Sequence, residues 1–106
     1  MPRYAAVDIG SNSVRLLVAE IDSGQKMQTL AAERQVTRLG ESVFRGGRIS
    51  QEAMRFVCDS LERMAETYRK YEVRAVRAVA TSAVRDAGNQ QEFLSRAGDA
   101  LGVPVE

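Results

Sequence analysis

The stretch from residue 5 to residue 18, Ala-Ala-Val-Asp-Ile-Gly-Ser-Asn-Ser-Val-Arg-Leu-Leu-Val, most constrains what this 106-residue chain can fold into. Two apolar runs flank a turn made of glycine, serine and asparagine, which are the residue types that favour tight turns. The pattern predicts a strand over residues 3–9 and a neighbouring strand over 14–22, joined by this turn. Residues 27–35 alternate weakly between apolar and polar side chains, so we expect a third strand and an antiparallel meander.

A helix is predicted after residue 50. Ser50 can cap its N-terminus, and Glu52 lies in the first turn, where the helix dipole favours an acidic residue. Apolar residues then recur at three- and four-residue spacing, which is typical of a helix packed against a core. This apolar stripe consists of Met54, Val57, Cys58, Leu61, Met64, Ala65 and Tyr68. Residues 36–49 contain three glycines, and we expect an irregular loop there.

The last third of the chain indicates a strand, a helix and the start of a further strand. Residues 73–80 are rich in valine and favour a strand, although the spacing of their two arginines would also suit a helix. Asn89 and Glu92 have the spacing of a capping box. The helix that follows would bury Phe93, Leu94, Ala97 and Leu101 and end at Gly102.

This order of elements predicts an α/β fold with a ribonuclease-H-like mixed sheet. Three antiparallel strands are followed by a helix, a parallel strand, a second helix and a truncated fifth strand over residues 103–105. A helix after a meander can cross over and add the fourth strand in parallel. The incomplete sheet edge could pair with a second copy of the chain, giving a homodimer.

The composition excludes several classes of function. Histidine is absent, which excludes histidine-based nucleophilic pairs and histidine zinc sites. The single cysteine excludes an intramolecular disulfide and favours a cytoplasmic location. A net charge of +1 predicts no binding to nucleic acid or to an anionic membrane surface. No apolar stretch approaches the roughly 20 residues that a membrane-spanning helix needs.

The basic residues are strongly biased toward arginine. All 15 of them except Lys26 and Lys70 are arginines. The planar guanidinium group suits bidentate recognition of phosphate, whereas a codon bias of the genome would explain the same excess without any function. The position of each arginine must decide between these interpretations.

Asp8 is the first candidate for chemistry. An aspartate at a strand end is usually a turn former, but Asp8 follows Val7 inside an apolar run, where burial of an unpaired carboxylate would be costly. We therefore expect Asp8 to hold Mg²⁺ through water or to orient an attacking water molecule. The turn beside it would offer N–H groups and hydroxyls to a phosphate, from Gly10, Ser11, Asn12 and Ser13.

Two observations qualify this interpretation. The turn could be an ordinary hairpin turn, because each of its residue types favours turns. Arg15 follows the turn in an otherwise apolar strand, where it would either face solvent or add a guanidinium to the site.

A second polar cluster covers residues 80–89, Ala-Thr-Ser-Ala-Val-Arg-Asp-Ala-Gly-Asn. Thr81 and Ser82 stand where the fourth strand should end and a helical turn begin, and Arg85 follows one turn later. Open α/β sheets bind ligands beyond the carboxyl ends of their strands. The alternative is a strand-to-helix cap with a surface pair between Arg85 and Asp86.

Taken together, three motifs resemble the exopolyphosphatase/guanosine pentaphosphate phosphohydrolase (Ppx/GppA) family. They are the Asp-Ile-Gly-Ser-Asn-Ser turn with its Arg-Leu, the segment Arg38-Leu39-Gly40-Glu41, and the cluster over residues 80–89. The family belongs to the actin–Hsp70–sugar kinase superfamily, whose domains share a ribonuclease-H-like core. The resemblance covers nearly the whole chain.

The resemblance implies hydrolysis of a terminal phosphoanhydride of inorganic polyphosphate or guanosine pentaphosphate. Asp8 would help to place Mg²⁺, and the turn at residues 10–13 would be the first phosphate-binding loop. Thr81, Ser82 and Arg85 would line the cleft against the terminal phosphates, with Arg15 and Arg38 nearby.

The resemblance also implies that residues 1–106 correspond to the N-terminal portion of the first actin-like ATPase-type domain. The family's catalytic glutamate, in a Ser-Gly-x-Glu-Glu-Ala-like segment, would follow residue 106, as would a second phosphate loop and a further domain. We therefore expect the isolated chain to bind phosphate without efficient turnover. The alternatives are a non-catalytic phosphate-binding or self-associating module, and a fragment of a superfamily sugar or acetate kinase.

Overall fold

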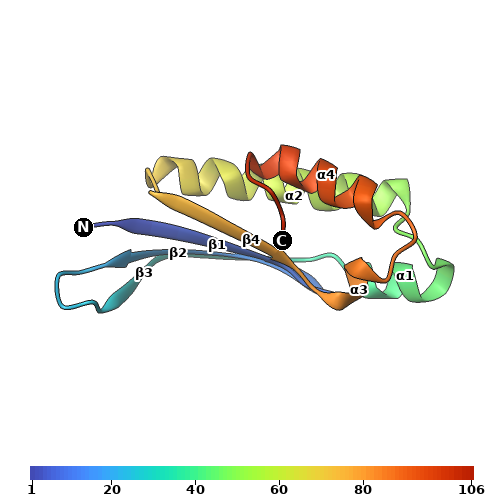
Figure 1. Cartoon of the computed structure of the whole chain (residues 1–106), viewed down its shortest axis with the longest axis horizontal. Coiled ribbons are helices and arrows are strands. Elements are labelled where there is room, and N and C mark those ends of the chain that lie inside the picture. The colour runs from blue at the N-terminus through green and yellow to red at the C-terminus, as the bar shows by residue number, and fades with distance from the viewer.

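A computed structural model of the chain describes residues 1–81 and 84–106 and shows a mixed sheet with the two longer helices over one face and the two shorter helices at one end (Figure 1). In chain order its elements are β1 (Arg3–Ile9), β2 (Ser13–Ile21), β3 (Met27–Val36), α1 (Leu39–Gly46), α2 (Gln51–Lys70), β4 (Ala75–Ala80), α3 (Ser82–Arg85) and α4 (Gln90–Leu101). Within the described residues the strand order is β3-β2-β1-β4. Strand β2 is antiparallel to both β1 and β3, and β4 is parallel to β1, which confirms the predicted mixed sheet.

Residues 105–106 form the start of a fifth strand beside β4, as the sequence predicts. Val105 forms an isolated parallel bridge with Ala78. The N–H of Glu106 donates to the carbonyl of Ala78, and the N–H of Ala80 donates to the carbonyl of Glu106, both at 2.9 Å. The backbone of residues 105–106 therefore runs along the outer edge of β4.

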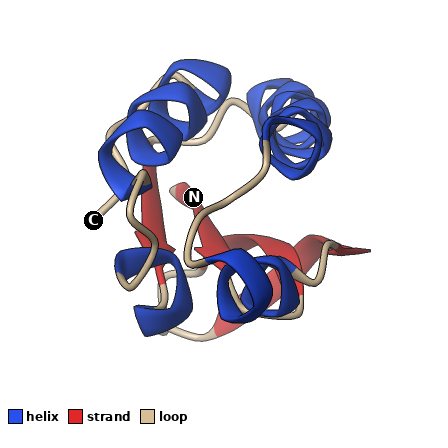
Figure 2. Ribbon diagram, turned by 90° about the vertical axis from the view of Figure 1, so that its right-hand side faces the viewer, coloured by secondary structure: helices blue, strands red, loops and turns tan.

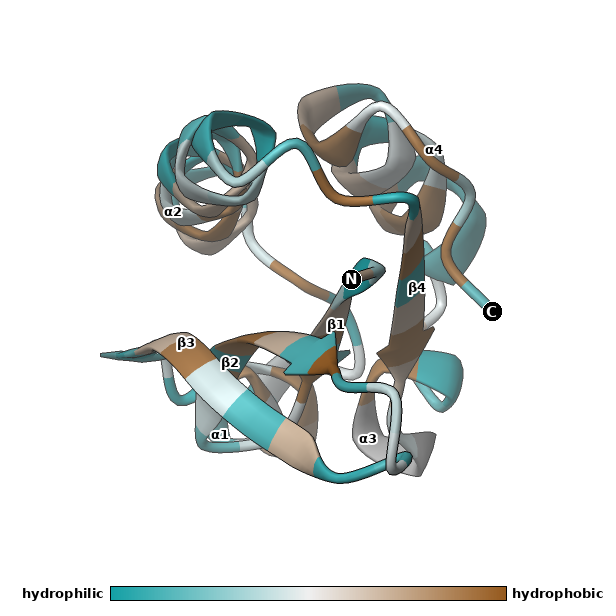
Figure 3. Cartoon of the chain, turned by 90° about the vertical axis from the view of Figure 1, so that its left-hand side faces the viewer, coloured by the Kyte–Doolittle hydropathy of each residue, from teal (hydrophilic) through white to brown (hydrophobic). Residues whose placement is uncertain are grey.

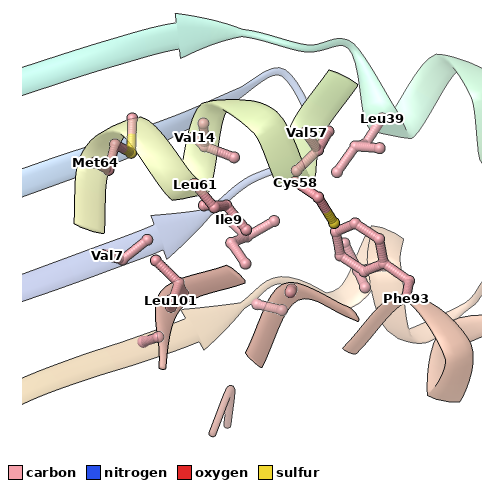
Figure 4. Packing of buried hydrophobic residues seen from close by; sticks show 14 of the residues in the cluster. Val7, Ile9, Val14, Leu39, Val57, Cys58, Leu61, Met64, Phe93 and Leu101 are labelled. Carbon is pink, nitrogen blue, oxygen red and sulfur yellow. The ribbon is translucent and has the colours of Figure 1, made fainter. Parts of the chain in front are cut away.

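The core lies between the sheet and the two longer helices, α2 and α4, which cover the same face (Figure 3). Alternate residues of β1 point toward these helices, so that Ala5, Val7 and Ile9 are buried, whereas Tyr4 and Asp8 are exposed on the opposite face. Figure 4 shows side chains of β1, β2, α1, α2 and α4 meeting in this layer, with Phe93 fully buried at one end.

The whole predicted apolar stripe of α2 is buried, and Ser50 caps the helix by accepting a hydrogen bond from the N–H of Ala53 at 3.1 Å. Cys58 is buried in this stripe, and burial raises the pKa of its thiol, with a smaller lowering by Arg96 and further raising by nearby carboxylates. On the face away from the core α2 is charged, and no helix among the described residues is long and apolar enough to cross a lipid bilayer.

The prediction of an irregular loop over residues 36–49 is wrong, because residues 39–46 form helix α1. Leu39 and Val43, four residues apart, are both buried and anchor one side of this helix. Gly47 ends it in the left-handed region at φ 71°, with its N–H bonded to the carbonyl of Val43. Gly40 does not break the helix; it allows close packing, because a Cβ there would lie 3.0 Å from the Cβ of Ser11.

The predicted capping box of α4 is also wrong. Asn89 is the N-cap residue, but its side chain makes no cap hydrogen bond. Its amide oxygen instead accepts from the N–H of Ile49, and its amide nitrogen donates to the carbonyl of Ile49, both at 2.9 Å. Asn89 is 9% exposed, so this pair of bonds joins the α1–α2 connection to the start of α4 inside the protein.

Replacement of Asn89 should therefore lower the stability of the chain more than the loss of a helix cap would. We expect Asn89→Ala to lower the free energy of unfolding by about 2–4 kcal/mol, because it leaves the buried N–H and C=O of Ile49 without partners. Urea denaturation followed by circular dichroism measures this, with Gln91→Ala, an exposed residue of the same helix, as the control. Equal effects of the two substitutions would show that the Asn89 bridge contributes nothing.

Candidate functional site

The turn between β1 and β2 is joined directly to the start of α1. Within the turn, the N–H of Gly10 donates to the carbonyl of Ser13 at 2.9 Å. The carbonyl of Asn12 accepts from the N–H groups of Thr37 and Arg38, and the carbonyl of Ser11 accepts from the N–H of Gly40 at 2.8 Å. These bonds bring the first two sequence motifs, 29 residues or so apart, into contact.

The third motif joins the same edge of the sheet. The N–H of Thr81 donates to the carbonyl of Ile9 at 3.1 Å, immediately before the turn. Helix α3 follows, and the N–H of Arg85 bonds back to the carbonyl of Thr81. Figure 2 shows α1 and α3 side by side at this end of the molecule. The three motifs therefore meet where β1 and β4 end, as expected for a ligand site of an α/β sheet.

The exposed part of the turn retains unused donors. Ser11 and Asn12 are exposed, and their N–H groups donate no hydrogen bond within the part of the chain that the structure describes. Successive unpaired N–H groups in a turn form a concave site for an anion. An anion could therefore accept from these two N–H groups, whereas Ser13 is 7% exposed and supports the turn from within.

Asp8 is exposed. The expectation that its carboxylate is buried inside an apolar run, at a cost in free energy, is therefore wrong. Strand alternation places it on the open face, while Val7 and Ile9 enter the core. In the sheet register Asp8 lies opposite Arg15 on β2. No ion pair forms between them within the described residues, so both charged groups are available to a ligand.

Arg34 is a candidate residue that the sequence analysis missed. It lies opposite Arg15 in the β2–β3 register, and its Nε donates to the hydroxyl of Ser13 at 3.3 Å. Two guanidinium groups directly opposite each other on a sheet repel, and an anion between them would relieve this. Asp8, Arg15 and Arg34 line the same hollow of about 520 Å³ on the open face. The sequence could not show that Arg34 lies beside Arg15 and Asp8, because no motif surrounds Arg34 and only the strand register brings the three together.

Two buried hydroxyl groups beside the turn have no hydrogen-bond partner within the described residues, those of Thr37 and Thr81. Thr37 adjoins the turn through the carbonyl of Asn12, and Thr81 adjoins the end of β1. A buried hydroxyl without a partner costs about 1–3 kcal/mol. Both unsatisfied groups therefore lie at the edge where the three motifs meet.

The remaining predicted residues lie around this edge. Arg38 is exposed and precedes α1 in the left-handed region at φ 55°. Arg85 is exposed at the end of α3, and within the described residues it forms no ion pair with Asp86, which the capping alternative required. Ser82 lies outside the described residues.

The described acidic residues near the turn are too few to enclose a metal ion, but they are compatible with a hydrated Mg²⁺. No group of three or more His, Cys, Asp or Glu side chains lies close enough to hold a metal within the described residues. Mg²⁺, however, keeps several water ligands and is commonly bound through one or two carboxylates together with substrate phosphates. The single exposed carboxylate of Asp8 beside the turn fits such a hydrated ion.

Residues 17–106 match the Ppx/GppA phosphatase family. Over 99% of its length the chain is 36% identical to "Exopolyphosphatase 2" of Mycobacterium tuberculosis, of which it covers 34%. It is also 36% identical to "Guanosine-5'-triphosphate,3'-diphosphate pyrophosphatase" of Vibrio parahaemolyticus, with 99% of the chain and 21% of that protein covered. The chain therefore spans about a third or less of these relatives.

Solved structures confirm the fold. A crystal structure of the Aquifex aeolicus Ppx/GppA phosphatase superimposes with a TM-score of 0.93 at 35% identity, covering 100% of this chain and 35% of that one. More distant likenesses are Thermus thermophilus RuvC, with a TM-score of 0.56 at 18% identity, and a PilM–PilN complex, with 0.59 at 20%. These two show only that the fold is ribonuclease-H-like.

The contact between Gly40 and the turn can be tested directly. We expect Gly40→Ala to destabilise the chain by about 1–3 kcal/mol, because the added methyl overpacks against Ser11 and must displace the turn. Gly46→Ala is the matched control in the same helix, since nothing lies within 4 Å of a Cβ there. Thermal unfolding and amide chemical shifts of residues 10–13 measure the effect. A stable G40A chain with unchanged turn shifts would contradict the proposed packing.

Proposed function

The chain belongs to the Ppx/GppA phosphatase family, and we propose from this that it binds the terminal phosphates of inorganic polyphosphate or guanosine pentaphosphate for hydrolysis. The observation that carries the proposal is the meeting of three motifs at one edge of the sheet. Backbone hydrogen bonds hold the turn at residues 10–13 against Thr37–Gly40 on one side and join Thr81 to the end of β1.

In this proposal the turn and the arginines bind phosphate oxygens. The N–H groups of Ser11 and Asn12 supply fixed dipoles, and Arg15 and Arg34 supply adjacent guanidinium groups from the open face. Charge-assisted bonds from guanidinium to phosphate are short and strong. Thr81, Arg38 and Arg85 lie around the same edge, and with Ser82 they complete the set that the sequence predicts.

Asp8 would hold hydrated Mg²⁺ beside these phosphates. When bound, the ion neutralises phosphate charge and stabilises the charge that develops during phosphoryl transfer. The exposure of Asp8 on the same face as Arg15, which follows from strand alternation, supports this role. Orientation of an attacking water is the other role that its position allows.

We further propose that the isolated chain binds more readily than it hydrolyses. Phosphoanhydride hydrolysis benefits from a carboxylate that deprotonates or orients water. Two other acidic groups near the site have partners within the described residues: Glu33 accepts a hydrogen bond from the Thr67 hydroxyl at 2.6 Å, and Glu41 pairs with Arg45 at 3.0 Å. The general base would then be the glutamate that the family resemblance places after residue 106.

Removal of the Asp8 carboxylate should abolish the effect of Mg²⁺ on the affinity of the chain for polyphosphate. We expect Mg²⁺ to tighten binding of tripolyphosphate to the wild-type chain by roughly tenfold, and Asp8→Asn to lose this gain while binding without Mg²⁺ is unchanged or improved. Isothermal titration calorimetry with and without Mg²⁺ measures the difference. Asp59→Asn, an exposed aspartate on α2, is the control for the loss of one negative charge. An unaltered Mg²⁺ effect in D8N would refute the proposed role.

Phosphate release separates binding from catalysis. We expect residues 1–106 alone to release phosphate from polyphosphate and from guanosine pentaphosphate at least a hundredfold more slowly than the full-length Aquifex aeolicus relative, because this proposal assigns the base to a position outside them. A colorimetric phosphate assay of both proteins under the same conditions provides the comparison. Comparable rates would show that residues 1–106 already contain the base.

A further inference from the structure

We propose that the groove between α1 and the N-terminus of α2 is a second phosphate-binding subsite, which binds internal phosphates of a linear polyphosphate whose end lies at the candidate site. This inference rests on the proposed function and narrows its substrate class to the longer, inorganic chain. The groove has a volume of about 770 Å³ and is lined in part by Arg38, Glu41, Arg45, Arg48 and Gln51.

The groove adjoins the candidate site at Arg38. Arg38 belongs to both, because its backbone N–H bonds to the carbonyl of Asn12 in the turn at 3.0 Å, and its side chain lines the groove. Arg38, Glu41 and Arg45 follow at three- and four-residue spacing and lie along one side of α1. Seven residues of helix extend about 10 Å, so this side leads away from the turn by the length of several phosphates.

The charge of the groove favours an anion. It contains three arginines and one glutamate, and the glutamate is already paired with Arg45 at 3.0 Å. Arg38 and Arg48 form no ion pair within the described part of the chain. The 20-residue helix α2 also begins at this groove, where Ser50 and Gln51 line it, and the positive end of a helix dipole attracts anions.

The wall that carries Arg48 is held in place before any ligand binds. Asn89 makes two hydrogen bonds of 2.9 Å to the backbone of Ile49, and the N–H of Gly88 donates to the carbonyl of Gly47 at 2.8 Å. Arg48 therefore lies in a segment bonded on both sides to the loop before α4. A preformed wall reduces the ordering cost of binding.

The lining also indicates which anion fits. None of the described residues along the groove is aromatic, so a nucleobase would find no ring on which to stack. Guanidinium, amide and hydroxyl groups make up most of its polar lining, and these bind phosphate oxygens without regard to a base or sugar. The groove thus suits a linear inorganic polyphosphate better than the nucleoside part of guanosine pentaphosphate.

Binding of polyphosphates of two lengths tests this subsite. Tripolyphosphate reaches the candidate site only, whereas a chain of about 14 phosphates should also enter the groove, so we expect the wild type to bind the longer chain more tightly. Arg48→Ala should weaken binding of the longer chain by roughly tenfold and leave tripolyphosphate binding unchanged. Arg48→Lys should lose less, because it retains the charge but not the planar fork.

The control is Arg74→Ala, which removes the same charge before β4, at the end of the sheet opposite the candidate site. Calorimetry at one fixed salt concentration measures all the proteins, and circular dichroism confirms that each is folded. Equal affinity of the wild type for both lengths, or an equal loss in R48A and R74A, would overturn the subsite while the proposed function stands. No binding of either polyphosphate to the wild type would overturn both.

Discussion

Three carbonyl groups at the end of β1 and in the turn that follows, those of Ile9, Ser11 and Asn12, accept the hydrogen bonds that assemble the candidate site. Their donors come from the start of α1 and from the end of β4, two parts of the chain that are distant in sequence. The N–H groups of Ser11 and Asn12, two exposed residues, donate no hydrogen bond within the described residues. The bonds to the three carbonyls thus build the junction, and its unused donors are open to an anion.

The two faces of the sheet differ in what they carry: one is packed in the core, and the other bears charged side chains. One face buries the alternate apolar residues of β1 and β2 under α2 and α4 and stabilises the domain. The other carries Asp8, Arg15 and Arg34 in one row across β1, β2 and β3. A one-residue shift in register would exchange the faces, so the core also determines the position of the charged row.

The arginines of this chain fall into groups with different surroundings. Arg3 and Arg77 pair with Glu20 and Glu106, each at about 3 Å, away from the edge where the motifs meet. Arg15, Arg34, Arg38 and Arg48 have no carboxylate partner within the described residues, and all four line the open-face hollow or the groove beside α1. Arginines on α2 also have no carboxylate partner there, so a missing partner does not by itself argue against a codon bias. What favours recognition of a polyanion is that these four gather around the candidate site and the groove.

Local pattern determined most of the secondary structure. Two apolar runs around a turn predicted β1 and β2. Three- and four-residue spacing predicted the stripe of α2, and the order of elements predicted the parallel addition of β4. The motifs at residues 8–15, 38–41 and 80–89 identified the family, because each needs only a short run of residues. The glycines at positions 40, 46 and 47 led to the wrong prediction of a loop. Glycine occurs both where a helix breaks and where two segments pack closely, and the sequence does not distinguish these cases.

Tertiary structure alone decided the rest. The exposure of Asp8 depends on which face of the sheet the helices cover. The positions of Arg15 and Arg34 opposite each other, and the hydrogen bonds from Asn89 to Ile49, join residues that are distant in the sequence. Short-range spacing cannot reveal such neighbours, because they follow from strand register and from the packing of helices on one side of the sheet. The sequence by itself therefore determined the elements and the family, whereas the packed sheet decided which charged groups face a ligand together.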